Sequence, residues 1–219
     1  MTPRPLRDPS RNLVLFTMAA ALAVAAGIAG CRVNVQKGAN GQDKNVRIDT
    51  PFGGVHVTTN QITAADLGLP AYPGATISPD HQNDKSANVH LGFGQWEMRV
   101  RVVNYSTPDS QEEVTAFYRK ALGRYGSVIA CQDGSPVGSP AATSEGLTCS
   151  GKDQPNIQVD GDNVNYGYHS GHGGFTLEAG SKRHQHIVAF KSFASGQTRF
   201  SLVEVQLPSS MGGGSGKSD

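Results

Sequence analysis

The fold of this chain is constrained most by a strand-like segment that is followed at once by a helix-like one. Residues 89–103 alternate apolar and polar side chains, which is the pattern of a β-strand with one buried face and one solvated face. The apolar set is Trp96, Met98, Val100 and Val102, and the polar set is Glu97, Arg99 and Arg101. We expect the first set to be buried and the second to face water.

The helix-like segment covers residues 107–126. Residues 107–110 supply N-cap side chains and a proline for the first helical position, and acidic Glu112 and Glu113 suit the positive end of the helix dipole. Gly126 ends the element. Between these ends, apolar residues recur at helical spacing: Val114, Phe117, Tyr118, Ala121, Leu122 and Tyr125. We predict an amphipathic helix whose apolar stripe lies on the sheet that contains the preceding strand.

Other segments combine strand periodicity with turn residues. Residues 175–177 predict a short strand, and three pairs of segments predict hairpins. The sequence therefore predicts an α+β fold: an antiparallel sheet of about five to seven strands with one main amphipathic helix packed on it, plus an N-terminal β-hairpin. The paired segments are 46–50 with 55–58, 157–159 with 164–166, and 186–193 with 198–207.

The N-terminal segment is organised like a secretory leader. Arg4, Arg7 and Arg11 make a basic beginning, and residues 13–30 are uncharged and mostly apolar. This run reaches the length of about 18 residues that suffices for a membrane span. It is rich in weakly hydrophobic Ala and Gly, however, and small residues precede Cys31 directly. We favour a cleaved signal over the alternative, a transmembrane helix with a free cysteine.

Ile28, Ala29, Gly30 and Cys31 resemble the lipobox of bacterial lipoproteins, in which a hydrophobic residue and two small residues precede the lipidated cysteine. The resemblance implies a diacylglyceryl group on the Cys31 sulfur, cleavage before this residue and acylation of the new amino terminus. Stable membrane retention takes about two acyl chains, which this modification supplies. The resemblance therefore implies anchoring but no activity.

Arg32 follows the lipobox cysteine. In some lipoproteins a residue other than Asp at this position directs delivery to the outer membrane, so the expected location is the outer membrane of a bacterial envelope, facing the periplasm. The chain carries 19 Lys and Arg against 18 Asp and Glu, and this balance gives no indication of nucleic acid binding. The expected partners are the membrane, through the lipid anchor, and an envelope protein or glycan.

Of three cysteines, two remain once Cys31 is assigned to the lipid. We predict a disulfide between Cys131 and Cys149, because disulfides persist in an oxidising envelope compartment. The bridge closes a loop rich in Gly, Ser, Pro and Ala. In the chain-entropy model this cross-link adds about 3 kcal/mol to the free energy of unfolding. A redox-active or nucleophilic cysteine is the alternative, but the chain contains no C-x-x-C motif.

Four of the seven histidines are candidate metal ligands. His184 and His186 share a face if they lie on a strand, and His169 and His172 lie in a glycine-rich segment. No H-E-x-x-H motif is present, and no acidic residue stands beside either pair at a recognised ligand spacing. We predict solvated histidines with no metal and no cofactor, and keep these four residues as candidates.

Three aromatic residues are candidates for a binding surface. Tyr166, Tyr168 and Phe175 lie among Gly, Asn and Ser, a context that resembles recognition loops for a carbohydrate or a protein, with packing under the helix as the alternative. The sequence contains no nucleophile elbow around Ser170. We expect a non-catalytic binding or interaction module, and the alternatives are a metal-dependent periplasmic enzyme and a structural spacer.

The chain is expected to comprise four segments. They are a leader (1–30), a lipidated spacer with the N-terminal hairpin (31–66), the α+β domain (67–208) and a disordered Gly- and Ser-rich tail (209–219). Within residues 67–126, the Tyr-Pro-Gly-Ala segment at Tyr72, the long strand and the Phe-Tyr-Arg-Lys segment at Phe117 resemble parts of uncharacterised bacterial envelope proteins. This resemblance supports the fold class and implies no activity.

Overall fold

A computed structural model describes most of the chain beyond the predicted leader. The predicted leader (1–30) and tail (209–219) lie outside the described residues. No helix in the described part of the chain is long and apolar enough to cross a membrane. The described residues are 31–38, 44–79, 85–149, 156–160, 163–167, 174–191 and 196–208.

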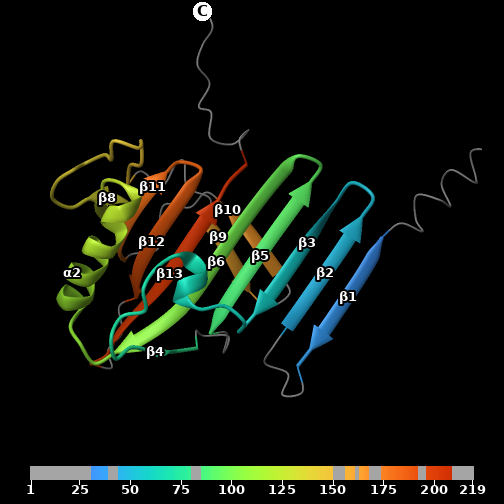
Figure 1. Cartoon of the computed structure of the whole chain (residues 1–219), viewed down its shortest axis with the longest axis horizontal. Coiled ribbons are helices and arrows are strands. Elements are labelled where there is room, and N and C mark those ends of the chain that lie inside the picture. Colours follow the sequence, from blue (N-terminus) through green and yellow to red (C-terminus); the bar gives the residue numbers. More distant parts are fainter. Residues whose placement is uncertain are drawn as a thin grey trace, which may run out of the picture.

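One large antiparallel sheet of eleven strands dominates the described chain (Figure 1). Ten strands follow the order β1-β2-β3-β5-β6-β13-β12-β11-β7-β8, and β4 pairs with the end of β6 beyond β5. The antiparallel sheet is confirmed, but the predicted number of strands was too low. The bounds are β1 (Arg32–Lys37), β2 (Lys44–Thr50), β3 (Gly53–Thr59), β4 (Thr76–Ile77), β5 (Ser86–Phe93), β6 (Trp96–Thr107), β7 (Ile129–Gln132), β8 (Ser135–Pro136), β11 (Phe175–Ser181), β12 (His184–Lys191) and β13 (Thr198–Gln206).

The stretch that we predicted as one long strand is a hairpin. A two-residue turn at Gly94 and Gln95 joins β5 to β6, so that Phe93 pairs with Trp96. Gly94 has a φ of 60°, a left-handed conformation that glycine adopts without steric cost. The apolar positions change from odd numbers (Val89, Leu91, Phe93) to even ones (Trp96, Met98, Val100) across this turn. The prediction of one strand overlooked that change of phase.

Two further segments add strands that the sequence did not indicate. Arg32–Lys37, predicted as a spacer, forms β1 and pairs with β2 along its whole length. Ile129–Gln132 forms β7, which pairs with β11 and with the two-residue β8. β1 pairs with the next strand along the chain, but its alternating Val33 and Val35 are both exposed, so no buried face marks it as a strand. β7 has only four residues, and its partner β11 lies far along the chain.

All three predicted hairpins are present. β2 with β3 and β12 with β13 are antiparallel neighbours in the large sheet. β9 (Asn156–Asp160) and β10 (Asn163–Gly167) form a separate two-stranded sheet. The N-terminal hairpin continues the large sheet, because β3 pairs with β5 from Gly53 opposite Phe93 to Thr59 opposite Ala87. The domain boundary at residue 67 stays a prediction.

The predicted amphipathic helix is confirmed as α2 (Gln111–Leu122). Ser110 is the N-cap: its hydroxyl accepts from the Glu113 backbone N–H, and its own N–H donates to the Glu113 carboxylate. Pro108 therefore lies before the cap, not at the first helical position as we predicted. A 3-10 turn, η2 (Gly123–Tyr125), follows the helix and ends at Gly126.

The helix packs over β11 and β12, on the face of the sheet that also carries Arg99 and Arg101 of β6. Because side chains alternate along a strand, Val103 and Tyr105 project to this same side, and both belong to the core that α2 covers. Met98 and Val100 are buried on the opposite face, behind which β9 and β10 cross the sheet in Figure 1. Met98 and Val100 are therefore buried and Glu97 is exposed, as expected. The expectation of a solvated second face was wrong further along β6, where Val103 and Tyr105 are buried on the same side as the arginines.

The apolar core lies at one end of the α2 face. It is closed by α2 and by η1 (Ala64–Leu67), a 3-10 helix between β3 and β4. Its largest fully buried side chains include Tyr118 of the helix and Phe200, Leu177 and Leu202 of the sheet. Beyond α2 and η1, the same face continues across β6, β5, β3 and β2 with polar side chains, and this region is the candidate site.

Candidate functional site

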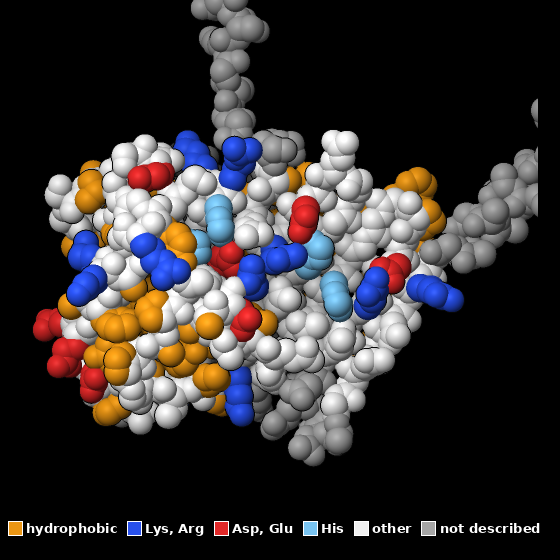
Figure 2. Space-filling model, in the orientation of Figure 1, with side chains coloured by type: hydrophobic (Ala, Val, Ile, Leu, Met, Phe, Trp, Pro, Cys, Tyr) orange, Lys and Arg blue, Asp and Glu red, His pale blue; other side chains and the backbone are white. Residues whose placement is uncertain are grey.

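Charged and histidine side chains cross the α2 face beyond the helix. Cross-strand pairing aligns Arg47, His56, His90 and Arg99 in one row over four adjacent strands. A second row aligns Arg101, Glu204 and His186 over β6, β13 and β12. Figure 2 shows these side-chain types together on this face. We call the whole set the charged band: Arg47, Asp49, His56, His90, Glu97, Arg99, Arg101, His184, His186 and Glu204.

Each carboxylate in the charged band contacts a basic side chain. Asp49 Oδ2 lies 2.9 Å from Arg47 Nε, and Glu97 Oε1 lies 2.9 Å from His90 Nε2. Arg47 and Asp49 are at least half exposed, so solvent screens their attraction and the pair adds little stability. With three arginines and three carboxylates, the band is close to neutral when its histidines are neutral, and it offers both signs of charge to a partner.

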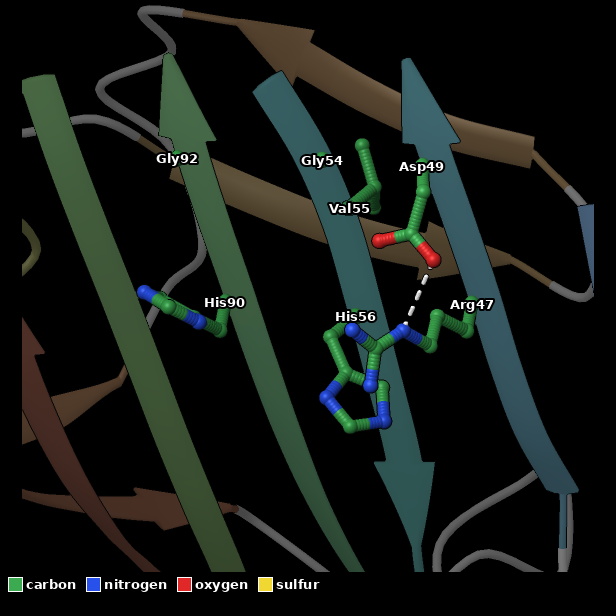
Figure 3. A pocket seen from close by; sticks show the side chains of 7 residues that line it. All are labelled: Arg47, Asp49, Gly54, Val55, His56, His90 and Gly92. Carbon is green, nitrogen blue, oxygen red and sulfur yellow. Dashed lines mark hydrogen bonds and ion pairs between the residues drawn. The ribbon is translucent and has the colours of Figure 1, made fainter. Parts of the chain in front are cut away.

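A shallow hollow interrupts the charged band where two glycines face each other. Gly54 of β3 pairs with Gly92 of β5, and the hollow has a volume of about 190 Å³. A side chain at Gly92 would meet no atom within 4 Å. Figure 3 shows the arrangement, with the Arg47 side chain extending toward His56 and held to Asp49. The hollow is open to polar groups of another molecule.

The most buried part of the charged band is a cluster of His184, His186 and Glu204. Their potential ligand atoms all lie within 4.8 Å of one another. His184 Nε2 lies 2.9 Å from Glu204 Oε1. His186 and Glu204 are only 3% and 5% exposed, whereas the His184 side chain is 48% exposed. The cluster therefore has two fixed members and one at the solvent boundary.

The surroundings hold His186 in its neutral form. The pKa of His186 is lowered to about 4, mainly by burial and also by the nearby His184 and Arg124, while Glu204 acts in the opposite direction. The imidazole also stacks on Tyr125, with ring centroids 3.6 Å apart. A neutral, oriented imidazole can accept a proton or bind a metal ion through a ring nitrogen.

The structure describes two of the four predicted histidine ligands and adds one residue that sequence reasoning missed. His184 and His186 lie on β12 and share a face, as we predicted. His169 and His172 lie outside the described residues. Sequence reasoning missed Glu204, which pairing places opposite His186. Its signal is a lone acidic residue between Val203 and Val205.

The aromatic candidates do not gather at the charged band. Phe175 of β11 packs against the core and lies 5.6 Å from Phe190 between ring centroids. The packing alternative therefore holds for this residue. Tyr168 and the side chain of Tyr166 lie outside the described part of the structure.

Comparison with known proteins adds no constraint. The chain matches no protein-family model, no curated protein and no solved structure. A functional assignment must therefore come from the chemistry of this chain.

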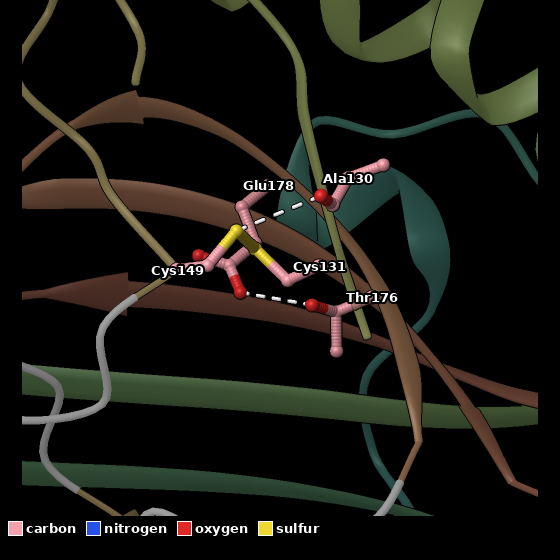
Figure 4. Close-up of a disulfide and its surroundings, with 5 residues drawn as sticks. All are labelled: Ala130, Cys131, Cys149, Thr176 and Glu178. Atoms are coloured by element: carbon pink, nitrogen blue, oxygen red, sulfur yellow. Dashed lines mark hydrogen bonds between the residues drawn. A yellow bond between two sulfur atoms is a disulfide. The ribbon is translucent and has the colours of Figure 1, made fainter. Parts of the chain in front are cut away.

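The predicted pairing of two cysteines is confirmed, and the lipidation of Cys31 stays a prediction. Cys131 and Cys149 form a disulfide with Cα atoms 5.5 Å apart. Figure 4 shows it beside Thr176 and Glu178, on the side of β11 opposite to the α2 core. Cys31 has a free, exposed thiol at the residue before β1. The position that the lipobox assigns to the lipid is therefore accessible.

Proposed function

We propose that this protein is a lipid-anchored component of a bacterial envelope that acts by binding another envelope protein, without catalysing a reaction. The observation that carries the proposal is the charged band, a broad face with paired charges of both signs outside the apolar core. The lipobox before Cys31 and the exposure of its thiol support the anchor. Arg32 after the cysteine supports the outer membrane as the location.

The charges of the band favour a protein partner over other envelope components. Complementary charges give specificity when a positive group meets a negative one across an interface. Asp49 and Glu97 project carboxylates that are at least half exposed, close to Arg47 and Arg99. A uniformly anionic polymer would be repelled by these carboxylates, whereas a folded protein with mixed charges can match both signs.

A glycan partner has less support. Sugar recognition commonly uses exposed aromatic faces, and Phe175 is packed against the core and not displayed at the charged band. The exposed polar groups near the hollow are charged side chains and histidines. A glycan is therefore an alternative outcome of the binding experiment.

Site-specific crosslinking in the envelope tests the binding proposal. A photoreactive residue placed at His56 or Arg99 should give the same protein adduct, and one placed at exposed Lys120 on α2 should not. Reversing Arg47 and Arg99 to Glu should reduce the adduct at least about tenfold, because like charges across an interface cost several kcal/mol. The matched control reverses Arg119 and Lys120.

Three outcomes would overturn the binding proposal. These are an equal adduct from Lys120, an adduct that is saccharide, and no adduct from any position. The last outcome, with no loss of any partner in a deletion strain, would favour a structural spacer.

Acyl labelling tests the anchor separately. Cys31→Ser should abolish incorporation of labelled palmitate, whereas Cys131→Ser, which leaves Cys31 intact, should retain it. If the Cys31→Ser chain stays in the membrane with residues 1–30 attached and the wild type incorporates no label, the anchor is a transmembrane span instead.

A further inference from the structure

We propose that His184, His186 and Glu204 form a binding site for a divalent transition-metal ion of the zinc and copper class. Two imidazoles and one carboxylate are a donor set that such ions prefer over Mg²⁺ and Ca²⁺, which take oxygen ligands. The proposal is independent of the partner-binding function, because it concerns the most buried part of the charged band.

The backbone brings the three side chains together from two adjacent strands. His184 and His186 are two residues apart on β12 and project to one face, and Glu204 of β13 lies directly opposite His186. Ligand atoms around a tetrahedral ion with bonds of about 2.0–2.1 Å lie about 3.4 Å apart. The observed separations of up to 4.8 Å therefore need a small contraction, which the exposed His184 can supply by rotating.

The two fixed members are held by neighbours in the way that ligands of a metal ion usually are. Tyr125 orients the His186 ring by stacking, and the Arg101 Nε lies 2.8 Å from Glu204 Oε2. Outer hydrogen bonds and ion pairs of this kind orient ligands and are part of most metal sites. Arg101 is held in turn, because it also donates to the Asp66 carbonyl oxygen.

The positive charge of Arg101 beside Glu204 opposes the binding of a cation, but the geometry of the carboxylate leaves one of its oxygens for a metal ion. The carboxylate uses its two oxygens for different neighbours: Oε2 faces Arg101, whereas Oε1 faces His184 Nε2 and the Gln206 amide. A metal ion can bind through Oε1 while Oε2 keeps its contact with Arg101. Without the ion, a proton between His184 and Oε1 occupies the place of the metal.

Metal binding would move the hydrogen that His184 shares with Glu204. His184 Nε2 and a carboxylate oxygen 2.9 Å apart share a hydrogen when His184 donates to Glu204. Because a metal ligand must present its lone pair, binding through this nitrogen requires the tautomer of His184 that carries its hydrogen on Nδ1. The exposed side of His184 leaves room for a water molecule or another ligand as the fourth donor.

Metal titration of the full chain, purified in detergent and stripped with a chelator, tests the proposal. Calorimetry should show a single Zn²⁺ or Cu²⁺ ion bound per chain and no binding of Mg²⁺ or Ca²⁺. His184→Ala should weaken binding at least about tenfold, since even an outer-shell change costs 10–100-fold.

Matched variants separate the site from histidines elsewhere. His90→Ala removes another histidine of the same face that also pairs with a carboxylate, Glu97, and it should leave affinity unchanged. A double change of His169 and His172 to Ala should leave it unchanged too. His184 is exposed, so its variant should fold, and circular dichroism checks this.

The proposal is overturned if wild-type protein binds no transition metal. It is also overturned if His90→Ala or the His169 and His172 double variant loses affinity as much as His184→Ala does. In the first case the cluster is an ion-pair network only, and in the second the metal binds elsewhere.

Discussion

His186 lies face to face on Tyr125, with ring centroids 3.6 Å apart and ring planes within 12° of parallel. Tyr125 ends η2 and packs against the core that α2 covers, and its hydroxyl donates to the Gly68 carbonyl oxygen at 2.5 Å. His186 belongs to the charged band. The stacked pair is therefore the contact through which the C-terminal end of the helix segment orients the buried part of the candidate site.

Two substitutions at Tyr125 separate its hydrogen bond from its stacking. Tyr125→Phe should cost about 1 kcal/mol in the free energy of unfolding, the net worth of one hydrogen bond, and should keep the His186 ring in place. Tyr125→Leu should cost a further 0.5–1.5 kcal/mol or so, because aromatic pairs add this much beyond their buried area. Urea unfolding measures both. Equal losses in the two variants would show that stacking contributes nothing.

Removal of the disulfide should destabilise the chain. The Cys131 and Cys149 bridge spans a sequence separation of 18 residues, so the double change to Ala should lower the free energy of unfolding by about 3 kcal/mol. Denaturant unfolding of wild type and variant measures the difference. Mass spectrometry of the mature wild-type protein should find no free thiol at these positions, and two free thiols there would contradict the bridge.

The carboxyl of Asp66 should titrate at an unusually low pH. Hydrogen bonds from the backbone N–H and side-chain hydroxyl of Thr63 lower the pKa of Asp66 below 3.8, and the charge of Arg101 lowers it further. The folded state thus favours the ionised form. Its stabilising contribution is complete above the unfolded pKa of 3.8 and is lost as the pH falls through the lower folded value.

NMR titration of the Asp66 carboxyl measures this shift directly. Thr63→Ala removes the hydroxyl but keeps the backbone donor, so it should raise the midpoint part of the way toward 3.8. An Asp66 midpoint at or above 3.8 in the wild-type chain would contradict the prediction.

Glycines near the hollow should differ sharply in their tolerance of a side chain. A Cβ at Gly53 would lie 2.1 Å from the Gly92 carbonyl oxygen, whereas a Cβ at Gly92 would meet nothing within 4 Å. Gly53→Ala should therefore destabilise the fold by about 1–3 kcal/mol through overpacking. Gly92→Ala should be neutral or stabilising by up to about 1 kcal/mol, because glycine weakens a strand. Denaturant unfolding measures both changes, and a similar loss of stability in the two variants would contradict this prediction.

Most elements with a local sequence signal were predicted correctly, whereas the pairing of distant strands was not. The helix was predictable because Ser110, Glu113 and the apolar stripe from Val114 to Leu122 all lie within one short segment. The hairpin of β5 and β6 was missed although it also has a local signal, the change of apolar positions from odd to even numbers across Gly94. β1 was missed because its two valines are exposed and give no buried face, and β7 because it is short and pairs with the distant β11.

Sequence reasoning identified only part of the candidate site. The spacing of His184 and His186 predicted a shared face, since side chains two apart on a strand project to one side. Glu204 and Arg101 could not be grouped with them, because no sequence spacing connects β6, β13 and β12. The pairing order of these strands decides that grouping.

The sequence by itself determined the local features: the capped amphipathic helix, the three hairpins and the pairing of Cys131 with Cys149. Only the tertiary structure decided which face α2 covers, and hence which charged residues of β6 stay beside the core and which apolar ones are buried behind it. The physical reason is that caps and periodicity act over a few residues. The order of strands in a sheet depends on backbone hydrogen bonds between segments that are far apart in the chain.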